Sequence, residues 1–252
     1  MNRIELLSTA LLSLFPTTAF LQNKEPPNVQ YLVLSLEDAV KPGMIDEYIQ
    51  TTKEWIKLLK NKEVKTSFNT FSESNGIVNY LEPMFSMSDM DKRALNDALE
   101  SFHRTELGQK RQSTIRWSKY SVWSRSSQLS YNPVNPDAST NNMPYFVWKH
   151  IKLHAGNEST FIEIATKFKE IFQKHRVGRG YGVFCNIIGY ERPWYTVIFP
   201  GKDPGELYKW QQEMEQELGS ELKPILDKLY DITEQITEGS GWTIPELSLT
   251  SN

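Results

Sequence analysis

The feature of this sequence that most constrains its fold is an internal repeat. Tyr31-Leu32-Val33 returns as Tyr145-Phe146-Val147, and beyond these segments the matching positions settle at a spacing of 113 residues. The matched positions carry glycine or large apolar residues, in the pairs Gly43–Gly156, Tyr48–Phe161, Trp55–Phe168, Leu59–Phe172 and Phe71–Phe184. An ordered series of this kind indicates that one supersecondary unit occurs twice in the chain.

Each half has the pattern of a strand, a helix, two strands, a helix and a last strand. In the first half we predict strands at 31–36, 65–71, 77–87 and 118–127, and helices at 44–59 and from Ser88 or Asp89 to about 105. In the second half we predict strands at 145–153, 181–188 and 194–199, helices after Gly156 and Pro204, and a further helical piece that Ser220 caps. Residues 132–144 hold three prolines and several asparagines, which is typical of an exposed linker.

The β-α-β-β-α-β order is that of the ferredoxin-like unit, whose sheet has helices on one face and must bury the other. Two such repeats, 31–131 and 145–252, can cover each other's sheets. The chain therefore resembles the dimeric α/β-barrel superfamily, in a form where two repeats are fused, from about Tyr31 to Ser248. The resemblance implies an α+β fold in which two tandem ferredoxin-like repeats pack sheet to sheet as an intramolecular dimeric α/β-barrel. Such a chain can be a monomer or form a homodimer.

The N-terminus has the pattern of a secretory signal peptide. Arg3 precedes an apolar stretch from Leu6 to Phe15, Pro16 breaks it, and small residues follow up to Ala19. We therefore expect residues 1–19 to be a signal peptide cut after Ala19, residues 20–30 to be a flexible N-terminus, and the protein to be secreted or periplasmic. The alternative is an apolar helix that packs on the domain. No segment is long and apolar enough for us to expect a membrane span.

Charge and cysteine content exclude several classes of site. The formal net charge is -3 without a long basic run, so we expect no nucleic-acid partner. The single cysteine, Cys185, excludes an intramolecular disulfide and a cysteine-based metal centre. His150 and His154 lie on one face of a strand, but four residues of strand span about 13 Å, too far for one metal. We expect no metal site.

The strand at 145–153 carries the best candidates for a ligand site. Because side chains alternate along a strand, Val147 and Ile151 share one face with Lys149, while Trp148 and His150 share the other. If the first face meets the helices, the second points into the space between the two sheets. The candidate ligand-binding residues are Trp148, His150, Asn186, Tyr195, Trp194, Trp123 and Arg125. The alternative is a core strand with a hydrogen-bonded, inert histidine.

No Ser-His-Asp or Gly-x-Ser-x-Gly pattern is present, so we assign no catalytic residue and expect a non-enzymatic exported protein. We expect it to bind a small, partly apolar molecule between the two sheets. One alternative is a monooxygenase-like enzyme, cofactor-free or haem-dependent, since the superfamily includes such proteins. Another is a structural or interaction module with a packed interior. Fold resemblance alone does not choose among these functions.

Haem-degrading members of the superfamily use an asparagine on the first strand, a tryptophan near the third strand and a histidine on the second helix. Here His103 lies in the first half and Trp194 in the second, while Leu34 or Leu36 stands at the asparagine position of the first half. Neither repeat has the full set. We therefore expect no cofactor, with haem as the alternative.

Overall fold

The computed structural model describes residues 31–62, 66–84, 86–90, 93–134 and 143–249. The predicted signal peptide (1–19) and N-terminal segment (20–30) lie outside these residues. The first half contains β1 (Tyr31–Val40), α2 (Ile45–Asn61), β2 (Asn69–Glu73), β3 (Ile77–Met84), the 3₁₀ helix η1 (Met87–Met90), α3 (Arg93–His103), α4 (Glu106–Thr114) and β4 (Ile115–Arg125). The second contains β5 (Tyr145–Leu153), α5 (Glu158–Lys174), β6 (Gly182–Ile188), β7 (Trp194–Gly201), α6 (Pro204–Asp231), β8 (Thr233–Thr243) and the 3₁₀ helix η3 (Pro245–Leu247).

The eight strands are hydrogen-bonded in the order β1-β3-β2-β8-β5-β7-β6-β4, which is a closed barrel. The registered pairs are antiparallel; Leu36 lies opposite Tyr80 in β1–β3, and His150 lies opposite Thr196 in β5–β7. The expected α+β fold with two β-α-β-β-α-β repeats is confirmed.

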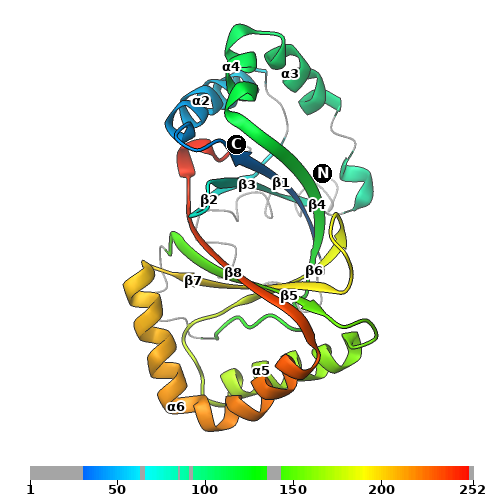
Figure 1. Cartoon of the computed structure of the whole chain (residues 1–252), viewed down its shortest axis with the longest axis vertical. Helices are drawn as coiled ribbons and strands as arrows, with labels where there is room; N and C mark the ends of the chain where they lie inside the picture. The colour runs from blue at the N-terminus through cyan, green and yellow to red at the C-terminus, as the bar shows by residue number, and fades with distance from the viewer. Residues whose placement is uncertain (1–30, 63–65, 85, 91–92, 135–142, 250–252) are drawn as a thin grey trace, which may run out of the picture. The chain divides into compact units, whose positions relative to one another are not determined.

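The described chain forms two compact units. The first unit comprises residues 31–122 and 241–249, and the second unit comprises residues 123–240. In the first unit α2, α3 and α4 accompany the sheet, and in the second α5 and α6 do so (Figure 1). No helix in the described ranges has the length and apolar character needed to cross a membrane.

The sequence repeat is visible in the backbone and in the core. Gly43 and Gly156, which precede α2 and α5, have φ angles of 77° and 84°, in the left-handed region that glycine adopts without strain. Tyr48 on α2 and Phe161 on α5 are both buried, each in the hydrophobic core of its own unit. Matching positions in the two repeats therefore turn the chain and fill the core in the same way.

The second helical segment differs between the repeats and from the prediction. In the first repeat it consists of α3 and α4, and Thr105 caps α4 by accepting a hydrogen bond from the Gly108 N–H. The sequence pattern missed α4, which is polar over most of its surface. In the second repeat the predicted cap at Ser220 is wrong, because α6 runs without a break from Pro204 to Asp231.

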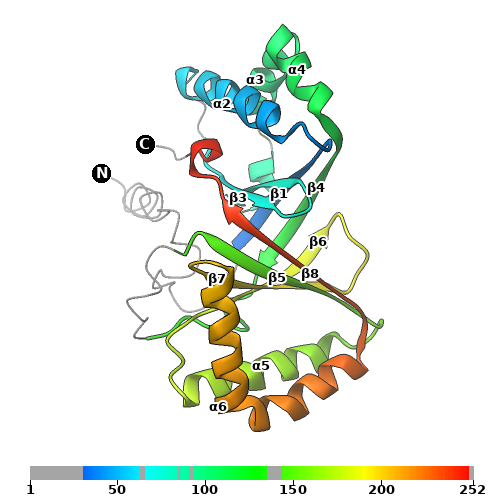
Figure 2. The ribbon, with the colours of Figure 1, turned by 60° about the vertical axis from the view of Figure 1, so that its left-hand side comes forward.

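Helix α6 changes direction part-way along its length (Figure 2). Pro224 lies inside the helix, where it has no N–H for the carbonyl of Ser220 and its ring clashes with that carbonyl. Such a clash bends a helix instead of ending it. The two arms of α6 therefore face the sheet of the second unit from different directions.

Candidate functional site

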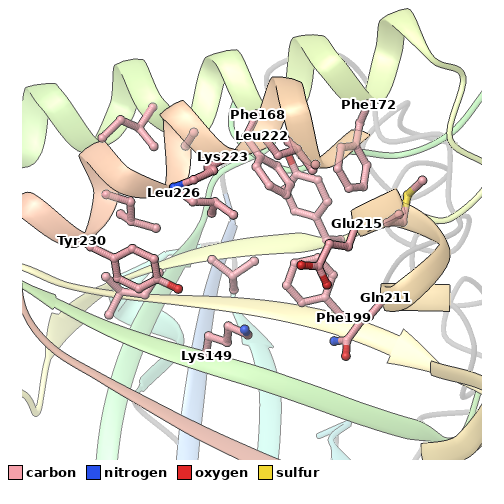
Figure 3. A pocket seen from close by; sticks show the side chains of 18 of the residues that line it. Lys149, Phe168, Phe172, Phe199, Gln211, Glu215, Leu222, Lys223, Leu226 and Tyr230 are labelled. Carbon is pink, nitrogen blue, oxygen red and sulfur yellow. The ribbon is translucent and has the colours of Figure 1, made fainter. Parts of the chain in front are cut away.

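A cavity of about 730 Å³ lies in the second unit, between the helix-facing side of β5, β6 and β7 and the helices α5 and α6 (Figure 3). Pockets that hold small organic molecules typically have volumes of about 300–1,000 Å³ and mainly apolar walls with a few polar groups. The cavity meets both criteria. In Figure 3, Lys149 and Phe199 lie on the sheet side, while Phe168, Phe172 and Leu222 lie on the helix side.

Seven aromatic side chains line the cavity: Tyr230 and a group of six from both layers, Phe161, Phe168, Phe172, Tyr181, Phe199 and Trp210. Their rings contact one another, as Phe168 stacks on Phe172 at 4.7 Å between centroids, and Phe172 meets Trp210 edge-on at 6.5 Å. Arg179 stacks on Trp210 at 4.7 Å from the ring centroid and pairs with Glu206, so the indole is held in place. Mutually packed rings therefore make up much of the cavity wall.

Aliphatic side chains complete the walls: Ile151, Val183, Val197, Leu222, Leu226 and Leu229. The second arm of α6 supplies the three leucines, and the first arm supplies Trp210 and Met214. The bend near Pro224 therefore lets one helix cover two sides of the same space.

Four charged side chains line the cavity: Lys149, Glu215, Lys223 and Asp227. Lys223 pairs with Asp227 on the same helix at 2.8 Å, and Lys149 pairs with Glu238 of β8 at 3.4 Å. These side chains are all partly or largely exposed to solvent, and Tyr230 beside them is 61% exposed. The charges therefore mark the mouth of the cavity, and its inner walls are apolar.

Tyr181 is the polar exception on the inner wall. Its side chain lines the cavity and is only 2% exposed, and its hydroxyl has no hydrogen-bond partner within the described chain. Burial raises the pKa of this phenol well above its ordinary value of 10. The hydroxyl is therefore protonated at neutral pH and able to donate a hydrogen bond.

The predicted site residues Trp148 and His150 lie on the opposite face of β5 from the cavity. His150 Nδ1 is 2.8 Å from Thr196 Oγ1, and the His150 ring lies 6.3 Å from that of Trp123. Trp123 in turn lies 5.3 Å from Tyr190. Trp148 packs on β8 so closely that a Cβ at Gly239 would clash with its indole. The structure thus brings His150 and Trp123 together, on the side of the sheet away from the helices.

The other predicted site residues are divided between the two faces. Asn186 is fully buried, donating to the Ile188 carbonyl at 3.0 Å and accepting from the Tyr190 N–H at 3.2 Å, so it shapes the β6–β7 hairpin. Tyr195 points toward the helices, where its ring stacks on Phe161 at 4.0 Å. It therefore belongs to the core on the helix side and not to the group around His150.

Trp194 and Arg125 complete the predicted set. The Trp194 ring lies 5.3 Å from that of Tyr190, which places it with Trp123. Arg125 at the end of β4 is 1% exposed, and burial lowers the pKa of its guanidinium to about 10. None of the seven predicted residues lines the described cavity.

In the first unit, a buried hydrogen-bond network joins the helices to the sheet. Arg111 of α4 reaches Asp38 of β1 at 2.7 Å, and the Tyr48 hydroxyl donates to the same carboxylate at 2.7 Å. Tyr80 of β3 bonds to Tyr48 at 2.6 Å, and Ser118 donates to the second oxygen of Asp38 at 2.5 Å. This network joins strand and helices and satisfies its own polar groups, so it needs no ligand.

Among the described residues, no group of three His, Cys, Asp or Glu side chains is placed so that it could hold a metal ion.

No protein-family model matches the chain, and no curated protein matches it in sequence. Solved structures do match its fold. An anthrone oxidase-like protein superposes with a TM-score of 0.57 at 12% identity, over 86% of this chain and 92% of that one. A variant of chlorite dismutase from Candidatus Nitrospira defluvii superposes with a TM-score of 0.51 at 11% identity, over 88% and 93%. The fold is that of the dimeric α/β-barrel proteins. At these identities the likeness concerns the fold alone.

Proposed function

We propose that this protein binds a small, mainly apolar molecule in the helix–sheet cavity of the second unit. The observation that carries the proposal is the cavity itself, about 730 Å³ lined by aromatic and aliphatic side chains, with charged groups at its mouth. A packed core leaves few voids larger than a water molecule. An apolar space of this size, retained beside mutually packed rings, is better explained by a ligand than by structural need.

The proposal is tested by filling the cavity. Ala165 on α5 lines it, whereas Ile162 on the same helix is exposed. Ala165→Trp places an indole in the cavity, and Ile162→Trp adds the same ring outside it. We expect the wild type and Ile162→Trp to bind 2-ethylnaphthalene with equal affinity in a calorimetric titration. We expect Ala165→Trp to bind at least about tenfold more weakly, a loss of about 1.4 kcal/mol.

Equal binding by both tryptophan variants, each with a cooperative thermal transition, would contradict the proposal. Absence of binding by the wild type would also contradict it.

Haem does not fit this cavity. In proteins, haem iron is held by His, Cys, Met or Tyr. None of the four histidines lines the described cavity, nor does Cys185; the residues there with donor atoms are Met214, Tyr181 and Tyr230. Burial keeps the Tyr181 phenol protonated by raising its pKa, and a protonated phenol is a poor ligand for iron. Methionine accompanies a histidine in cytochromes, and Tyr230 is largely exposed at the mouth. Haem is therefore not the ligand that we propose for this cavity.

A cofactor-free monooxygenase is the second candidate. It is supported by the fold shared with the anthrone oxidase-like protein and by the aromatic walls of the cavity. This candidate predicts that anthrone stimulates oxygen consumption above the uncatalysed rate, and that Ala165→Trp abolishes the stimulation. Binding alone predicts no oxygen consumption above the uncatalysed rate with either protein.

We also propose that the protein is exported. The apolar segment from Leu6 to Phe15 and the small residues up to Ala19 support cleavage by a signal peptidase. N-terminal sequencing of protein from its natural host should begin at Phe20. An intact N-terminus at Met1 would contradict export by this route.

A further inference from the structure

Tyr181 has a hydroxyl that its own fold does not use. The side chain lines the cavity, and no hydrogen-bond partner for the hydroxyl exists within the described residues. A buried polar group without a partner is destabilising, so native proteins contain few of them. The neighbouring tyrosine, Tyr131, differs in this respect, because its hydroxyl donates to the Val177 carbonyl at 2.8 Å.

The matching position of the first repeat indicates which part of the Tyr181 side chain the fold uses. Tyr181 and Phe68 are separated by the repeat spacing of 113 residues, and each forms an isolated β-bridge beside its sheet. Phe68 packs against Trp55, and Tyr181 packs against Phe168, the residue that matches Trp55. The ring is thus common to both repeats, whereas the hydroxyl occurs only in the repeat that has the described cavity.

The surroundings of Tyr181 define the chemistry of a partner. Phe168 and Phe172 meet its ring edge-on at 5.4 and 5.3 Å, and Phe199 lies at 5.6 Å. An anionic group here would be buried among apolar rings, which is unfavourable without a counter-ion, since the lysines that line the cavity are at its mouth. A neutral oxygen acceptor has no such cost.

From this arrangement we infer that the Tyr181 hydroxyl donates a hydrogen bond to a neutral oxygen of the bound molecule. The cavity therefore selects apolar molecules that carry a ketone, ester or ether oxygen over the corresponding hydrocarbons. This inference rests on the proposed function. Phe168, which meets the Tyr181 ring edge-on, is only half-buried, so a bound molecule that displaces this ring would reach the hydroxyl.

The test compares two probes with the same ring system, 2-acetonaphthone and 2-ethylnaphthalene, in calorimetric titrations with the full chain. We expect Tyr181→Phe to weaken binding of the ketone about 3- to 10-fold and to change binding of the hydrocarbon less than about 2-fold. The variant should unfold at the same temperature as the wild type or higher, because phenylalanine fills the matching position of the first repeat. As a control, Tyr131→Phe removes a hydroxyl that already has a partner, and it should leave both affinities unchanged.

If Tyr181→Phe leaves the ketone affinity unchanged, or weakens both probes equally, the inference is overturned while the proposed function stands. If the wild type binds neither probe, both are overturned.

Discussion

In the first unit, the Arg111 guanidinium donates a hydrogen bond of 2.7 Å to the Asp38 carboxylate, and both side chains are buried. The two residues are 73 positions apart in sequence and join α4 to β1. In the second unit, the space between helices and sheet contains the cavity. The described interiors of the two units therefore differ: the first contains a buried polar network, and the second contains an apolar cavity.

Arg111→Met tests whether the network stabilises the first unit. The variant leaves the Asp38 carboxylate buried without its cation, which should lower the free energy of unfolding by about 3–5 kcal/mol. Lys110→Met removes the neighbouring, exposed partner of Glu47 and should cost no more than about 1 kcal/mol. Urea unfolding of both variants gives the comparison. Equal small losses would show that the buried pair does not hold the unit together.

Tyrosine burial predicts a loss of stability at alkaline pH. Burial raises the pKa of Tyr195 from 10 to about 12, so the folded protein retains a proton that the unfolded chain releases near pH 10. The contribution of this phenol is complete below about pH 10 and is lost as the pH rises towards about 12. Tyr195→Phe keeps the ring that stacks on Phe161 but removes the titrating group.

The stability of Tyr195→Phe should therefore match the pH dependence of the wild type below about pH 10 and fall less steeply between about pH 10 and about pH 12, measured by urea unfolding. Tyr208→Phe alters an exposed tyrosine and serves as the control. Identical pH profiles for the wild type and Tyr195→Phe would disprove the assignment.

Pro224 links the shape of α6 to binding. Pro224→Ala supplies the missing N–H and removes the ring that bends the helix, so α6 should straighten and its two arms should no longer enclose the cavity. We expect weaker binding of 2-ethylnaphthalene, together with an increase in the free energy of unfolding of up to about 3 kcal/mol. Pro204→Ala, at the start of the same helix where proline is tolerated, should change neither quantity appreciably. Unchanged affinity in Pro224→Ala would show that the bend is not needed for the cavity.

Much of the fold was predictable because its signals are local and occur twice. Gly43 and Gly156 mark the same turn, and the apolar spacing of α2 and α5 identifies their buried faces. The helix α4 was missed because its sequence is polar on most sides. Arg111 is one of these polar residues, and its side chain is buried against Asp38. Asp38 is too far away in sequence for a local pattern to reveal the pair.

The site was harder to predict than the fold. Strand alternation correctly separated Lys149 and Ile151 from Trp148 and His150, but it cannot show which side of a strand has open space. That depends on side chains from α5 and α6, and on the direction of α6 after Pro224. The sequence contained one signal of this open space: Lys149 is a charged residue among apolar ones on the helix-facing side of β5.

The most direct test of the central claim is to locate a bound molecule by NMR. In protein with labelled methyl groups, titration with 2-acetonaphthone should shift the methyl resonances of the cavity walls: Ile151, Val183, Val197, Leu222 and Leu226. The core methyl groups of the first unit should remain in place: Ile56, Leu59, Val78 and Leu247. Shifts confined to the first set would establish the cavity as the binding site. Shifts in the first unit alone, or none at saturating probe, would contradict the account.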